Sequence, residues 1–294
     1  MPLPPSLDAA LLAPDAAGAL RALDATGELV TLIPELNAGR GFAQPELHYY
    51  DVLQHNLAAV EALDSIAGET PYGQELRDTL AWYDTGAVFS RALDGTPVLA
   101  LLRLACLVHD VAKPHTATTI DGRLRFPRHG PRGAEIMAAR LPTLGLAPGA
   151  VSFVTTLVRY HLRPAELVRA WPPTDRAVRR FARDLHGEVL PLMLLQMADG
   201  MATRGPAYTD EHFRRHCQFV NYVVAHAHEV TAQPEPPLLT GEDLMTELGL
   251  AGGRLLGAVL TSIRQAQYTR AITTRAEALD LARRTLATLT AGSA

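Results

Sequence analysis

Lysine is almost absent from this chain: of 27 Lys and Arg residues, 26 are arginine and only Lys113 is lysine. Two cysteines, Cys106 and Cys217, are too few for a disulfide scaffold or a Cys-rich zinc module, so we expect two buried thiols in a reducing cytoplasm. No uncharged apolar run reaches the roughly 18 residues that span a bilayer, and the first residues lack the basic leader of a secretory signal. We therefore expect a cytoplasmic protein without membrane contact.

Net charge is also low. The 294 residues are 48% apolar and 20% charged, with a formal net charge of −4. This composition suits a folded core and lacks the strong positive field of a general nucleic-acid coating protein, although a local basic surface remains compatible with it. Within an arginine-rich chain the single Lys113 stands out, because an ammonium is a compact charge that can titrate whereas guanidinium is a planar fork.

Alternating apolar and polar patterns typical of strands are missing, whereas Ala, Leu, Arg and Glu dominate. The sequence therefore predicts an all-α fold with a helical core and an additional C-terminal helical tail. We place a neck-like helical segment at residues 1–44, the core domain at 45–232 and the tail at 233–294. The second boundary follows the proline-rich stretch TAQPEPPLL, after which Thr240 and Asp243 have the pattern of a helix-capping box.

Prolines and capping residues set the predicted helix limits. The most apolar helix is expected to have Thr96 as its N-cap and Pro97 in its first turn, and to stop at Pro114. Further helices are expected from Pro45 to about Ala67, near Gln74–Asp84, from Pro131 to Leu141, from Pro148 to before Pro164, at Asp175–Leu185, at Glu188–Met201 and from Thr209 to about Val230.

Histidines and carboxylates on apolar helical faces form the strongest chemical signal. His55, His161 and Asp199 share helical stripes with apolar residues, and His109 with Asp110 ends a strongly apolar helix. A buried carboxylate without a partner is costly, so it neutralises or pairs with a cation. Imidazole and carboxylate ligands without thiolate suit a divalent metal, and they discriminate little among Mn, Fe, Co, Ni, Zn and Mg.

Each of these positions has a simpler explanation when it is taken alone. A histidine on an apolar face is more often a hydrogen-bonded core residue, Asp199 could be an ordinary helix-end residue, and His129 a loop residue that bonds the backbone. The ordered set is less easily explained in this way. The predicted metal ligands are His55, His109, Asp110, His129, His161 and Asp199.

The order His, His-Asp, His, His, Asp resembles the dinuclear variety of the HD superfamily of metal-dependent phosphohydrolases. The sequence is more similar still to the HD-containing body of bacterial CCA-adding enzymes, the tRNA nucleotidyltransferases of the poly(A)-polymerase type. Matching stretches include LACLVHDVAKP, FPRHGPRGAEIMAARL, LVRYHLRP and MADGMATRGP, and together they cover about residues 30–285. Residues 1–44 do not supply the glycine-rich loop and paired aspartates of the nucleotidyltransferase head, and the chain has no Asp-x-Asp pair. We therefore do not expect nucleotide addition.

The resemblance implies hydrolysis of small phosphoesters, with 2′,3′-cyclic phosphodiesterase and nucleotide phosphatase as the implied activities. We expect two divalent ions about 3.5–4 Å apart, bridged by Asp110 and by a water whose pKa falls toward about 7. In this hypothesis His55, His109 and Asp199 complete one ion site, and His129 and His161 complete the other.

Cations are predicted to balance the charge of the phosphoryl group. Lys113, Arg132 at a helix start and Arg204 are the candidates for substrate binding, and Lys113 and Arg132 are assigned with Asp110 to catalysis. The alternative for each cation is an ordinary surface charge. For two further groups of residues the sequence does not decide between contact with RNA and a purely structural role. These are the arginines Arg176, Arg179, Arg180, Arg183, Arg214 and Arg215, and the tyrosines Tyr49, Tyr50 and Tyr160.

The expected substrate is a phosphoester on a nucleotide or an RNA end, with tRNA or other RNA contact. A homodimer and a separate subunit that supplies a nucleotidyltransferase head are left open. Two alternatives remain: hydrolysis of nucleoside triphosphates or dinucleoside polyphosphates, and a non-catalytic tRNA-binding module whose metal ligands serve structure. Six intact ligands and the lone lysine favour the enzyme, because a structural site closes with four ligands.

Overall fold

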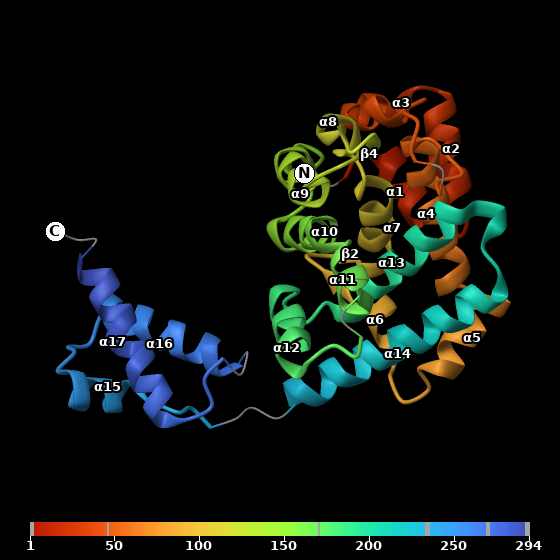
Figure 1. Cartoon of the computed structure of the whole chain (residues 1–294). Coiled ribbons are helices and arrows are strands. Elements are labelled where there is room, and N and C mark those ends of the chain that lie inside the picture. The colour runs from red at the N-terminus through yellow and green to blue at the C-terminus, as the bar shows by residue number, and fades with distance from the viewer. Residues whose placement is uncertain (1–2, 46, 170, 233–235, 269–270, 292–294) are drawn as a thin grey trace. The chain divides into compact units, whose positions relative to one another are not determined.

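The computed structural model describes residues 3–45, 47–169, 171–232, 236–268 and 271–291 (Figure 1). Helices dominate these residues, and the strands among them are only two or three residues long, so the expected all-α class is confirmed. The chain divides into two compact units, Met1–Glu166 with Glu188–Val224, and Leu167–Gly187 with Ala225–Ala294. The domain limits expected at residues 44 and 232 stay a prediction.

The first unit holds most of the elements. Its helices are α1 (Pro5–Leu12), α2 (Ala16–Ala25), α3 (Glu28–Leu32), the 3-10 helix η1 (Pro34–Gly39), α4 (Val52–Ala67), α5 (Pro71–Thr79), α6 (Thr85–Ser90), α7 (Val98–Val108), α8 (Lys113–Thr116), α9 (His129–Thr143), α10 (Pro148–Tyr160), α13 (Val189–Arg204), the 3-10 helix η2 (Gly205–Ala207) and the first part of α14 (Asp210–Ala232). Its strands are β1 (Ala92–Leu93), β2 (Thr96–Pro97), β3 (Thr118–Ile120) and β4 (Arg123–Arg125). Helix α11 (Arg163–Arg169) spans the division, and the second unit holds α12 (Asp175–Asp184), α15 (Gly241–Leu248), α16 (Arg254–Tyr268) and α17 (Arg275–Ala291).

Helix α7 is the centre of the first unit. Apart from Arg103, which pairs with Asp64, its sequence VLALLRLACLV is apolar, which is typical of a helix surrounded by protein, and all of its residues except Leu99 are buried. Helices α4 and α13 pack against each other and against α7, α10 joins α7 to α9, and α1 and α2 cover α7 and α4 (Figure 1). The helix therefore carries its C-terminal end, where His109 and Asp110 follow, into the middle of the packed unit.

Two short hairpins accompany the helices of the first unit. Strand β1 pairs with β2, and β3 pairs with β4, both antiparallel. Their turns are Asp94-Gly95 (φ 51° and 84°) and Asp121-Gly122 (φ 51° and 71°), and positive φ at both central residues is the conformation that Asp-Gly favours. Strands this short cannot display an alternating pattern, although the Asp-Gly pairs were visible in the sequence.

Some expected helix limits were wrong. Helix α4 begins at Val52 rather than near Pro45, because the Asp51 carboxylate accepts a hydrogen bond from the Gln54 amide and caps it there. Thr96 lies in β2 and does not cap α7. Helix α7 ends at Val108, before the predicted stop at Pro114.

The tail has a core of its own. Leu239, Leu244, Val259 and Ile263 are buried together with Ala278. The predicted capping box is confirmed, since Thr240 accepts a hydrogen bond from the Asp243 amide while the Asp243 carboxylate accepts one from the Thr240 amide. The described residues of 236–268 and 271–291 thus contain a small buried apolar core.

Both cysteines are buried free thiols, as expected. Across the described ranges, no helix is both long enough and apolar enough to traverse a lipid bilayer.

Candidate metal centre

Six polar side chains converge inside the first unit. They come from helix α4 (His55), the end of α7 and the turn after it (His109 and Asp110), the first turn of α9 (His129), the end of α10 (His161) and the middle of α13 (Asp199). These are the six residues expected from the sequence, and they form two overlapping groups that share Asp110, the ligand atoms of each group lying within 4.8 Å of one another. Their role as metal ligands stays a prediction.

The Asp110 carboxylate faces both groups. Its Oδ2 lies 3.3 Å from His55 Nε2 and 3.2 Å from His109 Nε2. Its Oδ1 lies 3.2 Å from His129 Nε2 and 3.6 Å from His161 Nε2. Each oxygen therefore faces a different pair of imidazoles, which is the arrangement of a carboxylate that bridges two cation positions.

Three of the histidines are oriented by their own backbone. The Nδ1 atoms of His109, His129 and His161 lie 2.8, 2.7 and 2.7 Å from the carbonyl oxygen three residues earlier in each case. Whenever the ring is neutral, a hydrogen bond donated from Nδ1 fixes the tautomer that leaves a lone pair on Nε2. The Nε2 lone pairs are then directed at the space around Asp110.

This arrangement of lone pairs needs a cation. His129 Nε2 and His161 Nε2 are 3.0 Å apart, and His55 Nε2 is 3.2 Å from His109 Nε2. Two neutral imidazole lone pairs at that distance repel unless a proton or a metal ion lies between them. Both Asp110 oxygens are buried; Oδ2 has the Lys113 ammonium beside it, whereas Oδ1 faces only the Nε2 atoms of His129 and His161. A divalent ion bound between these groups would satisfy the buried carboxylate.

Burial sets the electrostatics of the cluster. Burial and the charge of His129 lower the pKa of His161 to about 3, so its ring is neutral at pH 7. Burial opposes the charged form of His109 too, but the carboxylates of Asp110 and Asp199 outweigh it and raise that pKa to about 10. The two carboxylates thus attract positive charge into the core. The Asp199 side chain is 22% exposed, which makes it the most accessible of these groups.

Lys113 lies beside the cluster and is buried rather than on the surface. Its Nζ is 2.5 Å from Asp110 Oδ2, donates a hydrogen bond of 2.7 Å to Gln44 Oε1 and lies 3.4 Å from His48 Nε2. Burial and the Lys113 charge lower the pKa of His48 to about 4. Gln44 and His48 were missed in the sequence because they belong to an irregular segment before α4, where helical periodicity gives no information.

The other predicted cations lie elsewhere. Arg132 is 57% exposed and its Nη1 is 3.0 Å from Glu135 Oε2, while Arg204 Nη1 lies 3.5 Å from His212 Nε2. No contact in the described part of the chain joins either guanidinium to the cluster, and their substrate-binding roles stay predictions.

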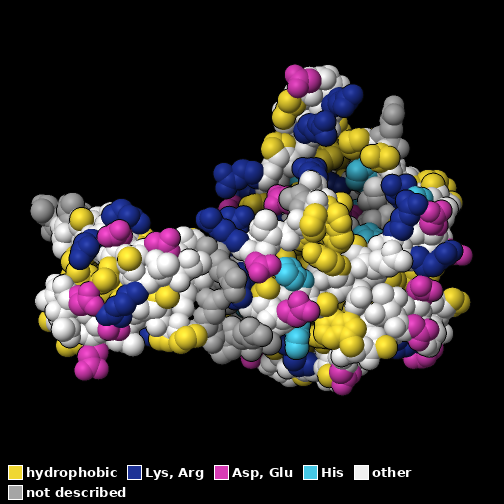
Figure 2. Space-filling view, turned by 60° about the horizontal axis from the view of Figure 1, so that its bottom comes forward, with side chains coloured by type: hydrophobic (Ala, Val, Ile, Leu, Met, Phe, Trp, Pro, Cys, Tyr) yellow, Lys and Arg dark blue, Asp and Glu magenta, His cyan; other side chains and the backbone are white. Residues whose placement is uncertain are grey.

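The wider sets of arginines and tyrosines also differ in their environments. Arg179 is buried, whereas Arg215 is exposed and pairs with Glu211. Tyr49 is 63% exposed and packs edge-on against Tyr50. On the face shown in Figure 2, some histidine side chains lie beside Lys or Arg and others beside acidic and hydrophobic side chains.

Comparison with known families gives the cluster its context. The family model of the HD domain matches residues 76–201. The chain carries an HD domain. The match includes His109 and Asp110, the pair for which such domains are named, as well as His129, His161 and Asp199; His55 precedes it. HD domains bind divalent metal ions, and an HD domain implies a metal-dependent phosphohydrolase.

Two relatives extend the similarity beyond the HD domain. The chain is 34% identical over 275 residues to an A-adding tRNA nucleotidyltransferase of Deinococcus radiodurans, and 32% identical over 272 residues to a CC-adding tRNA nucleotidyltransferase of Thermus thermophilus. These alignments cover 92% and 91% of this chain but 55% and 52% of the relatives. The resemblance to the HD-containing body of CCA-adding enzymes is thus confirmed, and the chain spans about half the length of these curated relatives.

Proposed function

We propose that this chain is a metal-dependent phosphodiesterase or phosphatase that acts on nucleotides or RNA ends, with 2′,3′-cyclic phosphodiesters as its main substrates. The main support is the Asp110 carboxylate, which directs one oxygen at His55 and His109 and the other at His129 and His161. A structural site needs only four ligands, and this cluster offers six around one shared carboxylate.

In this proposal the protein contributes a rigid, largely dehydrated set of ligands. His55, His109 and Asp199 would hold one ion with Asp110, and His129 and His161 would hold the other with the same carboxylate. When bound, the ions supply Lewis acidity toward a phosphoryl oxygen and lower the pKa of a water molecule. The partly exposed carboxylate of Asp199 marks the side from which substrate and water reach the cluster.

Lys113 has a separate role in the proposal. Its ammonium is held by Gln44 and Asp110 at the edge of the cluster, so it is positioned before substrate arrives. A fixed positive charge in a poorly solvated site stabilises the negative charge that develops on phosphoryl oxygens. The lysine thus acts on the substrate and not as a metal ligand.

The relatives support an RNA-linked substrate, since both are named for adding nucleotides to tRNA. We therefore propose RNA contact for this chain as well. The ring of a 2′,3′-cyclic phosphate exists at RNA ends and in mononucleotides, so both forms are included in the test below.

The test is a panel of substrates and metals. The full chain is stripped of metal and reloaded separately with Mn²⁺, Fe²⁺, Co²⁺, Ni²⁺, Zn²⁺ or Mg²⁺. Products from 2′,3′-cyclic AMP, AMP, dATP and a diadenosine polyphosphate are separated by chromatography, because opening the cyclic ester releases no free phosphate. We expect ring opening of 2′,3′-cyclic AMP to be the fastest reaction. Preferential cleavage of dATP or of the diadenosine compound would favour the nucleotide-hydrolase alternative, and metal binding without any turnover would favour the binding module.

A further inference from the structure

The β3–β4 hairpin connects two parts of the candidate site. It follows α8, which begins with Lys113, and it leads through Phe126 to His129. In its antiparallel register Thr118 is opposite Arg125 and Ile120 is opposite Arg123. Since directly paired residues point to the same side of a sheet, these four side chains share one face of the hairpin.

Two arginines on this face have no acidic partner. Arg123 and Arg125 are exposed, and within the described ranges neither guanidinium makes a hydrogen bond or an ion pair. Several other arginines of the first unit pair with carboxylates even at the surface, as Arg21 does with Glu61. Two guanidinium groups on the same face of one strand, neither paired with an acid, can bind an anion together.

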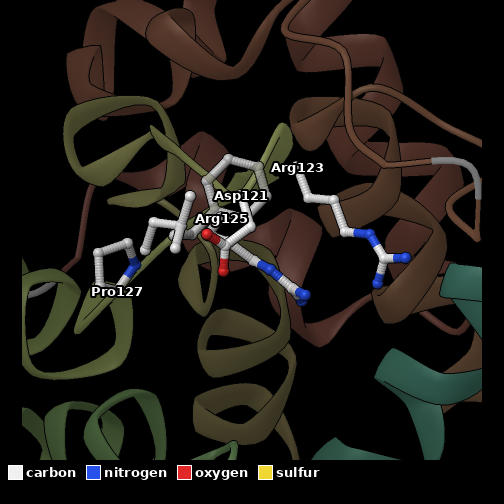
Figure 3. A pocket seen from close by; sticks show the side chains of 6 residues that line it. Asp121, Arg123, Arg125 and Pro127 are labelled. Atoms are coloured by element: carbon white, nitrogen blue, oxygen red, sulfur yellow. The ribbon is translucent and has the colours of Figure 1, made fainter.

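The same residues border a cavity. Ile120, Asp121, Arg123, Arg125, Phe126 and Pro127 line a space of about 550 Å³. In Figure 3 the Arg123 and Arg125 side chains both extend away from Pro127. Ile120 adds an apolar surface that is 47% exposed, which suits contact with a sugar or a base.

Phe126 lies next to both this cavity and the metal cluster. Phe126 lines the cavity, and its ring centroid is 5.6 Å from Lys113 Nζ and 6.3 Å from the His129 ring. Its carbonyl oxygen also accepts the hydrogen bond that orients His129. A chain of phosphates that leaves the cluster past Phe126 would therefore meet Arg125 first and Arg123 next.

We propose that this hairpin face binds the backbone phosphates of a single-stranded nucleic acid whose terminal phosphoester lies at the metal cluster; the proposal rests on the function proposed above and specifies its substrate class as an oligonucleotide. Alternate residues of a strand are roughly 7 Å apart. That spacing matches successive phosphates of an extended single strand, whereas the phosphates of a triphosphate share bridging oxygens and lie much closer together. Asp121 lines the same cavity and opposes anion binding.

Three full-length variants test the proposal. R123Q/R125Q removes both guanidinium groups, and D121N removes the opposing carboxylate while keeping a residue that tolerates positive φ in this turn. R283Q/R284Q removes two arginines from the tail helix α17 as a charge-matched control. Circular dichroism and the melting temperature establish that each variant is folded.

The first measurement is the binding of a short fluorescent RNA with a plain 3′ hydroxyl, followed by anisotropy at several salt concentrations. For R123Q/R125Q we expect Kd to rise about tenfold and the slope of log K against log salt to fall by about 1.4, because each contact with single-stranded phosphate contributes roughly 0.7. D121N should bind roughly twofold more tightly, and the control should match the wild type. A wild-type Kd for R123Q/R125Q, or the same loss in the control, would overturn the proposal.

The second measurement compares kcat/KM for 2′,3′-cyclic AMP with kcat/KM for the same cyclic phosphate at the end of a short RNA. R123Q/R125Q should lose about tenfold on the RNA and nothing on the mononucleotide. If kcat/KM fell equally for the RNA and for the mononucleotide, or if dATP affinity fell by the same factor, the arginines would instead bind a mononucleotide or a polyphosphate. If the wild type hydrolyses neither compound but its RNA affinity still depends on the hairpin, the catalytic proposal fails and the binding surface stands.

Discussion

In the HD domain, charged side chains lie in the middle of the core, whereas in the tail of residues 236–291 they lie at its surface. Asp110 and Lys113 are 1% and 6% exposed. In the tail the centre is apolar, with Val259 and Ile263 fully buried, and the Arg275–Asp243 ion pair lies outside. An apolar centre stabilises the folded state directly, but a buried charge cluster is costly unless something compensates it. The core of the HD domain therefore stabilises the folded state less than the apolar core of the tail does. A buried charge cluster of this kind is expected at a site that binds a ligand.

Removing the shared carboxylate should have the largest effect. Asp110→Ala takes away the oxygens that face both histidine groups, so we expect turnover to fall on the order of a thousandfold and bound metal to decrease. Elemental analysis and the cyclic phosphodiesterase assay measure the two effects. Asp280→Ala, an exposed carboxylate in the tail, is the control, and unchanged metal content with normal activity in Asp110→Ala would refute the bridging role.

Damage to the tail core should leave the metal centre intact. Ile263→Ala opens a cavity in a fully buried apolar site and should destabilise the tail by about 3 kcal/mol. We expect hydrogen exchange to accelerate in α15, α16 and α17 while metal content and mononucleotide turnover stay at wild-type values. A parallel loss of metal would show that the two cores are energetically coupled.

Lys113→Ala should separate catalysis from metal binding. The variant loses the fixed ammonium but keeps all six predicted ligands, so we expect turnover to slow about a hundredfold with unchanged metal content. Lys113→Arg is the informative control, because it keeps the charge but changes the compact group held by Gln44. A drop in metal content in Lys113→Ala would instead assign the lysine to the stability of the cluster.

Acid should weaken the first unit through His216 as well as through the cluster. His216 bonds Gln196 and Tyr208, and burial lowers its pKa to about 4 from an unperturbed value of 6.5. The unfolded chain therefore takes up the proton first, so stability is lost as the pH falls from about 6.5 to about 4 and is constant below that range.

Urea unfolding in chelator tests this prediction at pH 7 and pH 5. The decrease in the free energy of unfolding between these values should be about 2 kcal/mol smaller in His216→Gln than in the wild type. Identical pH dependence in the two proteins would show that His216 does not contribute.

Metal removal should produce the smallest shift. Free metal at about ten times its Kd stabilises a native site by about 1.4 kcal/mol, which is roughly 3–6 °C in the melting temperature of a unit of this size. Calorimetry with and without chelator should show this shift in the HD domain, and hydrogen exchange in the tail should not respond. If the chelator lowered protection against hydrogen exchange equally in the HD domain and in the tail, metal binding would not be specific to the HD domain.

The sequence predicted the helical class and the convergence of the six polar residues because both depend on helical periodicity. His55 and Asp199 lie on helices whose apolar faces are plain in the sequence, and the Thr240–Asp243 capping box is a local signal. Helical periodicity could not predict the roles of Gln44 and His48, because these residues contact Lys113 from a segment without regular secondary structure. It also failed for the β3–β4 hairpin, whose strands of three residues are too short for any pattern. Arg132 could not be placed because the direction of an exposed side chain depends on neighbours such as Glu135.

The hydrogen bonds from Nδ1 to the carbonyl three residues earlier make the orientation of His109, His129 and His161 a local property of each chain segment. His55 differs, because its buried Nδ1 has no hydrogen-bond partner among the described residues. Three rings are thus anchored by a hydrogen bond to the backbone, whereas the His55 ring is held only by packing and by the contacts of its Nε2 atom. We expect the cluster to accommodate cations of different radius chiefly by rotation of His55, so exchange between metals would disturb the position on the His55 side of Asp110 more than the position on the His161 side.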